Sequence, residues 1–339
     1  MRTPRPLPPA LLHLAAAQEG LVTFAQCEAH GVDGGRVARL VRQGRLVPVT
    51  RGVYDSVLVP PRDRTGPGSF DHRRRRSAVA GLLAYGASAV ATGACALALL
   101  GVAGLPVEVV PEVMLRDGGP RRRRDGVVAR RYQGCSIGSA EGWPVVSVED
   151  ALVQTIPTLG RRRALAVLDS ARHRGLVDAD GVARAHERAR GRPGVEHTHD
   201  VWGLTDERAE SPVESVARLS CIDGELAPDA LQLVLVDETG RFVARCDLAW
   251  WLGGTRWLVA EIDGEDPHSQ PEALFHDRVR QNAMLAGGVQ LVRVTGADAW
   301  RGALPGLVRP VLRRAGWEPG RPVPSGAVAL TGLDPSLSA

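Results

Sequence analysis

Two neighbouring runs of alternating residues constrain the fold of this chain more than any other feature. Residues Arg241–Trp250 and Trp257–Asp263 alternate with the period of two that is typical of β-strands. The first run carries Asp247 near its end, and the second ends on Glu261 and Asp263. Glu261 and Asp263 are two residues apart and therefore share one face of their strand. If the strands are neighbours, three carboxylates converge at one edge of a sheet.

The flanking sequence completes an α/β unit around these strands. Ser211 is expected to cap a helix that has Pro212 at its first position, and Leu231–Val236 is expected to pair with the first run as a hairpin. In that first run, Cys246 and Leu248 should lie on one face and Asp247 on the other. A helix over Pro271–Ala286, a fourth strand over Val289–Thr295 and a closing helix follow.

The converging carboxylates predict a Mg²⁺ site. Mg²⁺ binds through one or two carboxylates and keeps several waters, and it can activate water against a phosphodiester. An alternative is that carboxylates simply end strands at turns, because Asp263-Gly264 is also a turn dipeptide. Many Mg²⁺-dependent nucleases also need a lysine, yet all 42 basic residues of this chain are arginine. A codon bias is the favoured explanation of that usage, and selection for phosphate contacts is the alternative.

The string Val259-Ala-Glu-Ile-Asp-Gly264…His268…Asp277-Arg278…Arg280-Gln-Asn282…Leu285…Gly288-Val-Gln-Leu-Val-Arg293 resembles the very-short-patch-repair-like (Vsr-like) endonucleases of the PD-(D/E)xK superfamily. The resemblance runs from about Glu210 to Trp300. It implies Asp247 and Glu261 as metal ligands for Mg²⁺ or Mn²⁺, assisted by Asp263 and His268. It also implies Arg278 and Arg280 as phosphate contacts.

Two features depart from or qualify this resemblance. Asp263 occupies the lysine position of the superfamily; Vsr-like enzymes work without that lysine and rely on a nearby histidine, here His268.

Glu214 has two possible roles. It closes the capping box Ser211-Pro-Val-Glu214, so its carboxylate is expected to bond the Ser211 backbone. The resemblance instead implies a helical glutamate that faces the metal.

The N-terminal sequence predicts three short helices followed by a β-ribbon. The helices cover Pro9–Gln18, a segment opened by the capping box Thr23-Phe-Ala-Gln26, and a segment from Asp33 to Gln43; Arg45–Tyr54 then alternates like a hairpin. This order is typical of a winged helix-turn-helix.

The third of these helices separates apolar from basic residues. It places Val37, Leu40 and Val41 on one face and Arg36, Arg39 and Arg42 opposite, with Arg45 following. Such a face suits contact with DNA phosphates and base edges, although an ordinary solvated basic face is the alternative.

This segment resembles the N-terminal domain of AbiEi-type antitoxins. The resemblance rests on Gly20-Leu-Val-Thr-Phe, Arg39-Leu-Val-Arg-Gln-Gly-Arg-Leu and Val49-Thr-Arg-Gly-Val-Tyr54, and it covers about 45 residues. It implies a winged helix that binds promoter DNA, and a cognate toxin as a protein partner.

The rest of the sequence bounds the remaining possibilities. Five scattered cysteines without a CxxC spacing fit reduced thiols in a cytoplasm. No uninterrupted apolar run reaches membrane-spanning length, so no membrane partner is expected. The arginine runs Arg73–Arg76 and Arg121–Arg124 are expected to be solvated, or alternatively to follow phosphate.

Together these patterns predict an α+β multidomain protein. The expected parts are a winged helix-turn-helix over residues 8–56, a middle α/β region over 77–200, a restriction-endonuclease-like domain with a central mixed sheet over 206–317, and a disordered tail over 318–339. The predicted function is DNA binding of toxin–antitoxin or phage-defence type, with Mg²⁺-dependent hydrolysis of DNA by the C-terminal domain. The alternative is a non-catalytic antitoxin or repressor whose nuclease fold is degenerate.

Overall fold

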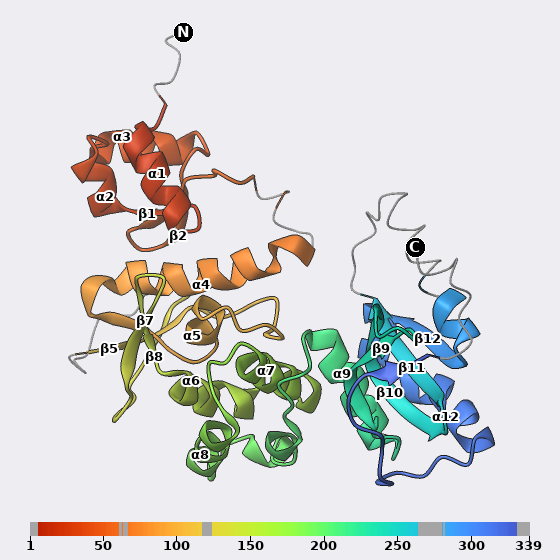
Figure 1. The fold of residues 1–339 in the computed structure, drawn as a ribbon. Coiled ribbons are helices and arrows are strands. Elements are labelled where there is room, and N and C mark those ends of the chain that lie inside the picture. The colour runs from red at the N-terminus through yellow and green to blue at the C-terminus, as the bar shows by residue number, and fades with distance from the viewer. Residues whose placement is uncertain are drawn as a thin grey trace. The chain divides into compact units, whose positions relative to one another are not determined.

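The computed structural model of the chain describes residues 6–60, 63, 67–116, 124–263, 280 and 282–330 (Figure 1). The chain divides into two compact units. Unit 1 contains residues 1–160 and 175–203, and unit 2 contains residues 161–174 and 204–339.

The N-terminal part of unit 1 packs three helices against a small antiparallel sheet of order β1-β3-β2. Its elements are α1 (Pro9–Ala17), β1 (Leu21–Thr23), α2 (Phe24–Ala29), α3 (Gly34–Arg42), β2 (Val47–Thr50) and β3 (Val53–Asp55). The predicted capping box at Thr23 and the predicted Asp33 cap are confirmed, because Thr23 accepts from the Gln26 amide and Asp33 accepts from the Arg36 amide. Strand β1 was not predicted, since three residues are too few to show alternation.

The middle part of unit 1 contains a five-stranded sheet of order β6-β5-β4-β8-β7. Its elements are α4 (Phe70–Tyr85), β4 (Ala89–Ala91), α5 (Gly93–Leu99), β5 (Glu112–Leu115), β6 (Val128–Arg130), β7 (Ile137–Ala140), β8 (Trp143–Val146), α6 (Val148–Thr155), the 3-10 turn η4 (Ile156–Thr158) and α8 (Ala179–Ala189). The long helix α4 lies along this part in Figure 1. The strands expected over Val107–Arg116 and Gly126–Gln133 are present in shortened form as β5 and β6.

Helix α4 binds the N-terminal part through its arginines. Arg75 Nε donates to Glu19 Oε1 at 2.8 Å, and Arg76 Nη2 lies 2.9 Å from Asp55 Oδ2. Arg76 Nη1 also donates to the Glu19 carbonyl at 2.7 Å. Arg73 pairs with Glu108, and Arg74 donates to Asp71 and to two backbone carbonyls. The expectation that Arg73–Arg76 is a solvated run is therefore wrong, because each guanidinium has a protein partner.

Unit 2 is built on a five-stranded mixed sheet of order β12-β11-β10-β9-β13, in which β11 and β12 are parallel. Its elements are α7 (Arg161–His173), α9 (Pro212–Asp223), β9 (Ala230–Val236), β10 (Phe242–Gly253), β11 (Arg256–Asp263), β12 (Val289–Thr295), α11 (Gly296–Arg301), α12 (Leu304–Arg314) and β13 (Val328–Ala329). The four predicted strands of this unit are confirmed. The predicted helix over Pro271–Ala286 lies mostly outside the described residues.

A separate apolar core covers each face of this sheet. Leu248, Trp250 and Leu258 pack with the helices α9, α11 and α12. Cys246 and Trp257 belong to the other core. Cys246 and Leu248 thus lie in different cores, so the prediction that they share one face is wrong. The alternation between the two cores therefore breaks at Asp247, although β10 itself continues to Gly253.

The described part of the C-terminal tail differs from the disorder expected for residues 318–339. Val328 and Ala329 form β13 beside β9, and Leu330 is buried in the core that contains Trp257. Gly287 makes room for Leu330, because a β-carbon at Gly287 would lie 2.8 Å from the Leu330 β-carbon. Residues 331–339 lie outside the described residues.

Across the described ranges, none of the helices is long and apolar enough to span a membrane.

Candidate functional site

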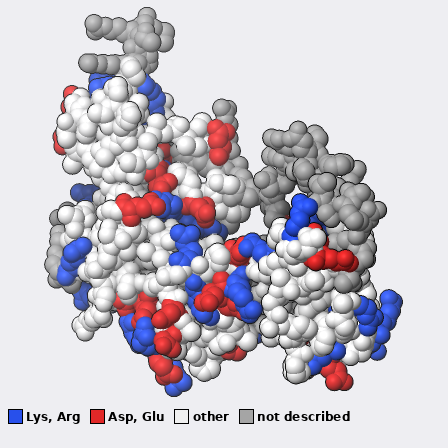
Figure 2. Space-filling model, in the orientation of Figure 1, with Lys and Arg blue, Asp and Glu red and all other residues white. Residues whose placement is uncertain are grey.

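Helix α3 presents a basic surface, and its arginines differ in whether they already bind other groups of the protein. Val37 and Leu40 are buried and Val41 is partly buried, as predicted. Arg39 and Arg42 are exposed, and neither has a hydrogen-bond or ion-pair partner among the described residues. In Figure 2, blue side chains lie on the N-terminal part next to the grey residues.

The other two predicted DNA contacts are already engaged. Arg36 Nη2 donates to the Pro6 carbonyl at 2.7 Å, so this guanidinium helps to hold the chain that leads into α1. Arg45 is half-buried and also interacts within the protein. Arg39 and Arg42 are therefore the arginines of this set that can approach a ligand without losing a described hydrogen bond or ion pair.

In unit 2, four polar residues form a row across adjacent strands. Asp247 follows Cys246, which pairs with Leu233, so its position falls opposite Gln232. On the other side, the pairing of Leu248 with Ala260 places Asp247 next to Glu261.

The row continues from β11 into β12, where Glu261 and Arg293 are direct partners. The row therefore reads Gln232, Asp247, Glu261, Arg293, on β9, β10, β11 and β12 in turn.

Arginines hold the Glu261 carboxylate. Arg293 donates from Nε and Nη2 to Glu261 Oε2 at 3.0 and 2.9 Å, and Arg280 Nη2 donates to the same oxygen at 3.2 Å. Glu261 is 6% exposed. Its second oxygen, Oε1, is buried and has no hydrogen-bond partner in the described part of the chain. Arg280, which the sequence suggested for phosphate, therefore also pairs with a carboxylate.

Asp247 is held by backbone and surrounded by acids. Its Oδ2 accepts from the Ile262 amide at 2.8 Å, so the side chain takes the place of a strand carbonyl. Burial raises the pKa of the Asp247 carboxyl to about 6, against the pull of the Ile262 hydrogen bond. The negative charges of Glu214 and Glu261 raise this pKa further, and a Gln232 hydrogen bond opposes them.

Glu214 belongs to the same cluster. Ser211 caps α9 by accepting from the Glu214 amide at 3.3 Å, as predicted. The Glu214 carboxylate does not close the box onto the Ser211 backbone. Its Oε2 accepts instead from the Glu210 amide at 3.0 Å and from Gln232 Nε2 at 2.9 Å. The helical glutamate thus faces the row of polar residues, and the capping-box role expected for its carboxylate is wrong.

Other predicted site residues fall outside this cluster or outside the described residues. Asp263 is exposed at the end of β11. His268 and Arg278 lie outside the described ranges. Among the residues that the structure describes, no group of three or more histidine, cysteine or acidic side chains has a geometry that could hold a metal ion. The roles of these residues in metal-dependent chemistry, and the binding of Mg²⁺ or Mn²⁺, remain predictions.

Two members of the cluster were not predicted as site residues. Gln232 has φ +53°, a left-handed conformation that is rare for residues other than glycine, and its buried Oε1 has no partner in the described part. A glutamine between Leu231 and Leu233 is a visible polar break in an apolar strand. Arg293 gives a similar signal inside β12, but its pairing with Glu261 depends on strand register, which the sequence does not show.

Comparison with known proteins gives a family match for the N-terminal part. Residues 9–54 match the family model described as "Transcriptional regulator, AbiEi antitoxin". The uncharacterized proteins MT2308 and Rv2248 of Mycobacterium tuberculosis, from strains CDC 1551 / Oshkosh and ATCC 25618 / H37Rv, are each 29% identical over 214 residues. These residues are 62% of this chain and 78% of each relative. No solved structure matches the chain. Over residues 9–54, the chain is thus similar to the transcriptional regulators of the AbiEi antitoxin family.

Proposed function

We propose that the protein is a DNA-binding transcriptional regulator of the antitoxin type, and that α3 is its recognition helix. The observation that carries this proposal is the exposed pair Arg39 and Arg42 on α3, within the segment that matches the AbiEi family model. Guanidinium groups on an exposed helix face suit both phosphate contacts and the bidentate recognition of guanine.

The order of elements supports a winged helix-turn-helix. Helices α2 and α3 are adjacent and joined by a short turn, and β2 and β3 follow as an antiparallel ribbon. Arg51 lies at the tip of this ribbon, where a wing would reach the DNA backbone. The wing and α3 would then contribute arginines to one interface.

Fluorescence anisotropy tests the proposal. The probe is a labelled duplex from the region upstream of the gene that encodes this chain, and the comparison is a duplex of the same length and shuffled sequence. A regulator should prefer the upstream duplex by about 1,000-fold or more at physiological salt. Equal affinity for both duplexes would remove the regulatory part of the proposal and leave non-specific binding.

The antitoxin assignment also predicts a protein partner, a cognate toxin encoded next to this chain. Co-expression of the tagged chain with each adjacent open reading frame, followed by size-exclusion chromatography, tests this point. A stable complex with a neighbour that is toxic when expressed alone supports the antitoxin role. A complex with none of them would leave the DNA-binding role without a toxin.

A second candidate function is metal-dependent DNA hydrolysis by unit 2. It is favoured by the convergence of Glu214, Asp247 and Glu261 and by the unpartnered Oε1 of Glu261. The order α9-β9-β10-β11-β12 is also compatible with a restriction-endonuclease-like core. The pairing of Glu261 with two arginines opposes this candidate, because Glu261 Oε2 is already neutralised.

Plasmid cleavage with Mg²⁺ or Mn²⁺ separates the two candidates. Cleavage by the wild-type chain that disappears in both Asp247→Ala and Glu261→Ala would establish the second function. Cleavage that survives both substitutions would place the activity at another site. If the wild-type chain leaves the plasmid intact, only the regulator function remains.

A further inference from the structure

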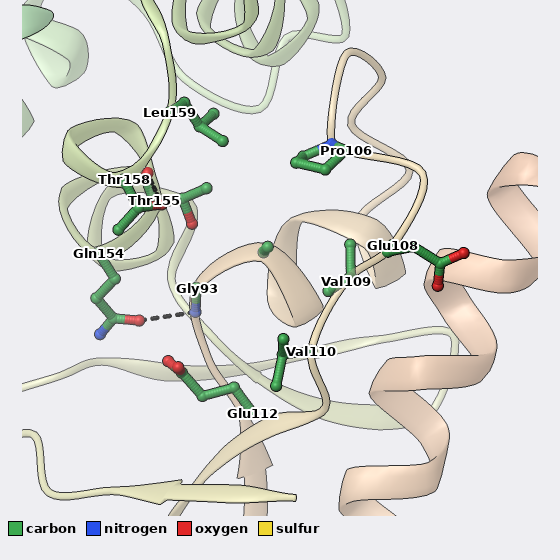
Figure 3. Close-up of a pocket in the computed structure, with 11 residues that line it drawn as sticks. Gly93, Pro106, Glu108, Val109, Val110, Glu112, Gln154, Thr155, Thr158 and Leu159 are labelled. Carbon is green, nitrogen blue, oxygen red and sulfur yellow. Dashed lines mark hydrogen bonds between the residues drawn. The ribbon is translucent and has the colours of Figure 1, made fainter. Parts of the chain in front are cut away.

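A pocket in the middle part of unit 1 lies apart from both sites described above. It has a volume of about 220 Å³ and is formed where the start of α5, the loop before β5 and the end of α6 meet (Figure 3). Its lining combines apolar groups, such as Pro106, Val109 and Leu159, with a few polar ones. A mainly apolar pocket with a small number of placed polar groups is the usual form of a small-ligand site.

One polar group in this pocket has no partner. Thr155 is 2% exposed, and its hydroxyl makes no hydrogen bond within the described residues. A buried hydroxyl without a partner costs about 1–3 kcal/mol, which a ligand that forms a hydrogen bond with it would recover. Thr158, beside it, donates to the Thr155 carbonyl and so is already satisfied.

Gly93 leaves space beside this hydroxyl. A β-carbon at Gly93 would lie 3.5 Å from Thr155 Oγ1 and 3.5 Å from Glu112 Oε1. Both oxygens therefore border the space that a side chain at this position would fill. Gly93 has φ +51°, and its amide donates to Gln154 Oε1 at 2.8 Å, which fixes the backbone at this point.

The charged groups of the lining favour a cationic ligand at the oxygen that has no arginine partner, Glu112 Oε1. The charged residues that line the pocket, Glu108 and Glu112, are both carboxylates. Their arginine partners, Arg73 and Arg130, are not part of the lining. Arg130 Nε donates to the other oxygen, Glu112 Oε2, at 3.0 Å. Among the described residues, Glu112 Oε1 accepts two long bonds, from Thr92 at 3.2 Å and from Tyr132 at 3.4 Å, and so retains capacity to accept another.

We propose that this pocket binds a small organic cation, an ammonium or guanidinium group carried on a short apolar stem. The cationic head would donate to Glu112 Oε1 and Thr155 Oγ1 above Gly93, and the stem would lie against Val109, Val110 and Leu159. The same chemistry is offered by a free metabolite and by an arginine or lysine side chain of a partner protein.

Ligand-observed NMR titration tests this proposal with two probes of the same shape. The probes are n-butylguanidinium, which is charged, and n-butylurea, which is neutral. The wild-type chain should bind the guanidinium at least about tenfold more tightly, because a hydrogen bond to a charged group contributes about 1.5–3 kcal/mol. Equal affinity for the urea, or no binding up to about 10 mM, would overturn the proposal.

Substitutions assign the binding to the named oxygens. Thr155→Val and Glu112→Gln should each weaken the binding of n-butylguanidinium by about tenfold. Thr155→Val should leave the fold intact, because the hydroxyl that it removes has no partner. Thr50→Val is the matched control, since the Thr50 hydroxyl is also buried and unpartnered among described residues but lies outside the pocket. Unchanged affinity in Thr155→Val, or an equal loss in Thr50→Val, would contradict the proposed site.

The blocked peptide acetyl-Gly-Arg-Gly-amide distinguishes the two sources of the cation. Tighter binding of the peptide than of n-butylguanidinium, lost in Thr155→Val, would indicate an arginine of a partner protein. Tighter binding of the free cation, lost in the same variant, would indicate a metabolite. Either result supports the site, and failure of both probes would exclude it.

Discussion

Arg293 and Glu261 are direct partners on the parallel strands β12 and β11, and Arg293 donates two hydrogen bonds to a single oxygen, Glu261 Oε2. The opposite oxygen, Oε1, is buried without a partner among the described residues. This pairing neutralises the glutamate that the sequence resemblance assigns to a metal. It explains how a chain without lysine keeps a buried carboxylate at this position.

We expect Arg293→Ala to destabilise the protein by about 2 kcal/mol, because it removes the main partner of a buried charge. Urea unfolding followed by tryptophan fluorescence measures this change. Arg245→Ala is the control, since Arg245 pairs with Glu210 on the exposed surface of the same sheet and should cost less than about 1 kcal/mol. Equal costs for the two substitutions would show that the pairing of Arg293 with Glu261 does not stabilise unit 2.

Much of this architecture can be predicted from the sequence because local rules govern it. The caps at Thr23, Asp33 and Ser211 act within three residues, and the strands β9 to β12 alternate over enough residues to be recognised. The short strands β1 and β4 carry too few residues for that signal.

Contacts that join distant segments escape such rules. Arg75 and Arg76 find Glu19 and Asp55 more than 20 residues earlier, and no local pattern announces those partners. The break at Asp247 is of the same kind, because it lies opposite Gln232, whose left-handed conformation in the neighbouring strand is not visible in the sequence. The candidate site could therefore be predicted as a set of carboxylates, but not as a set held by arginines.

The stability of unit 2 should depend on the protonation of Asp247. Because the pKa of Asp247 is raised to about 6 from 3.8, the folded state binds this proton more tightly than the unfolded state. The resulting stabilisation is complete below about pH 4 and is lost as the pH rises through about 6.

Asp247→Asn cannot ionise, so it should be more stable than the wild type by about 1–2 kcal/mol at pH 8, with partial exposure taken into account, and equal to it near pH 4. Urea unfolding in EDTA at both pH values measures this difference. Asp263→Asn, an exposed change on the neighbouring strand, should stay within about 0.5 kcal/mol at either pH. A stabilisation by Asp247→Asn that is the same at both pH values would contradict the ionisation account.

The attachment of the N-terminal part to α4 should depend on Arg76. Its partner Asp55 is 5% exposed and also accepts from the Val57 amide, so Arg76→Met leaves a buried carboxylate without its cation. We expect hydrogen exchange of the β1 and β3 amides to become faster by about tenfold or more, which corresponds to a loss of about 1.4 kcal/mol or more.

Arg73→Met provides the comparison, because Arg73 pairs with Glu108, whose side chain is largely exposed. Exchange in β1 and β3 should be unchanged in this variant. If amide exchange in β1 and β3 becomes equally faster in both variants, the effect comes from losing any arginine of α4. The bond between Arg76 and Asp55 would then have no specific role.

The central claim, that α3 lies on DNA, is tested most directly by the salt dependence of DNA binding. In Arg39→Ala/Arg42→Ala, two phosphate contacts are lost, and the slope of log K against log salt should become shallower by about 1.8. Arg313→Ala/Arg314→Ala removes the same charge from exposed positions at the end of α12 and should keep the wild-type slope. A wild-type slope in Arg39→Ala/Arg42→Ala, or the same loss in both double variants, would contradict the assignment of α3 as the DNA-contacting helix.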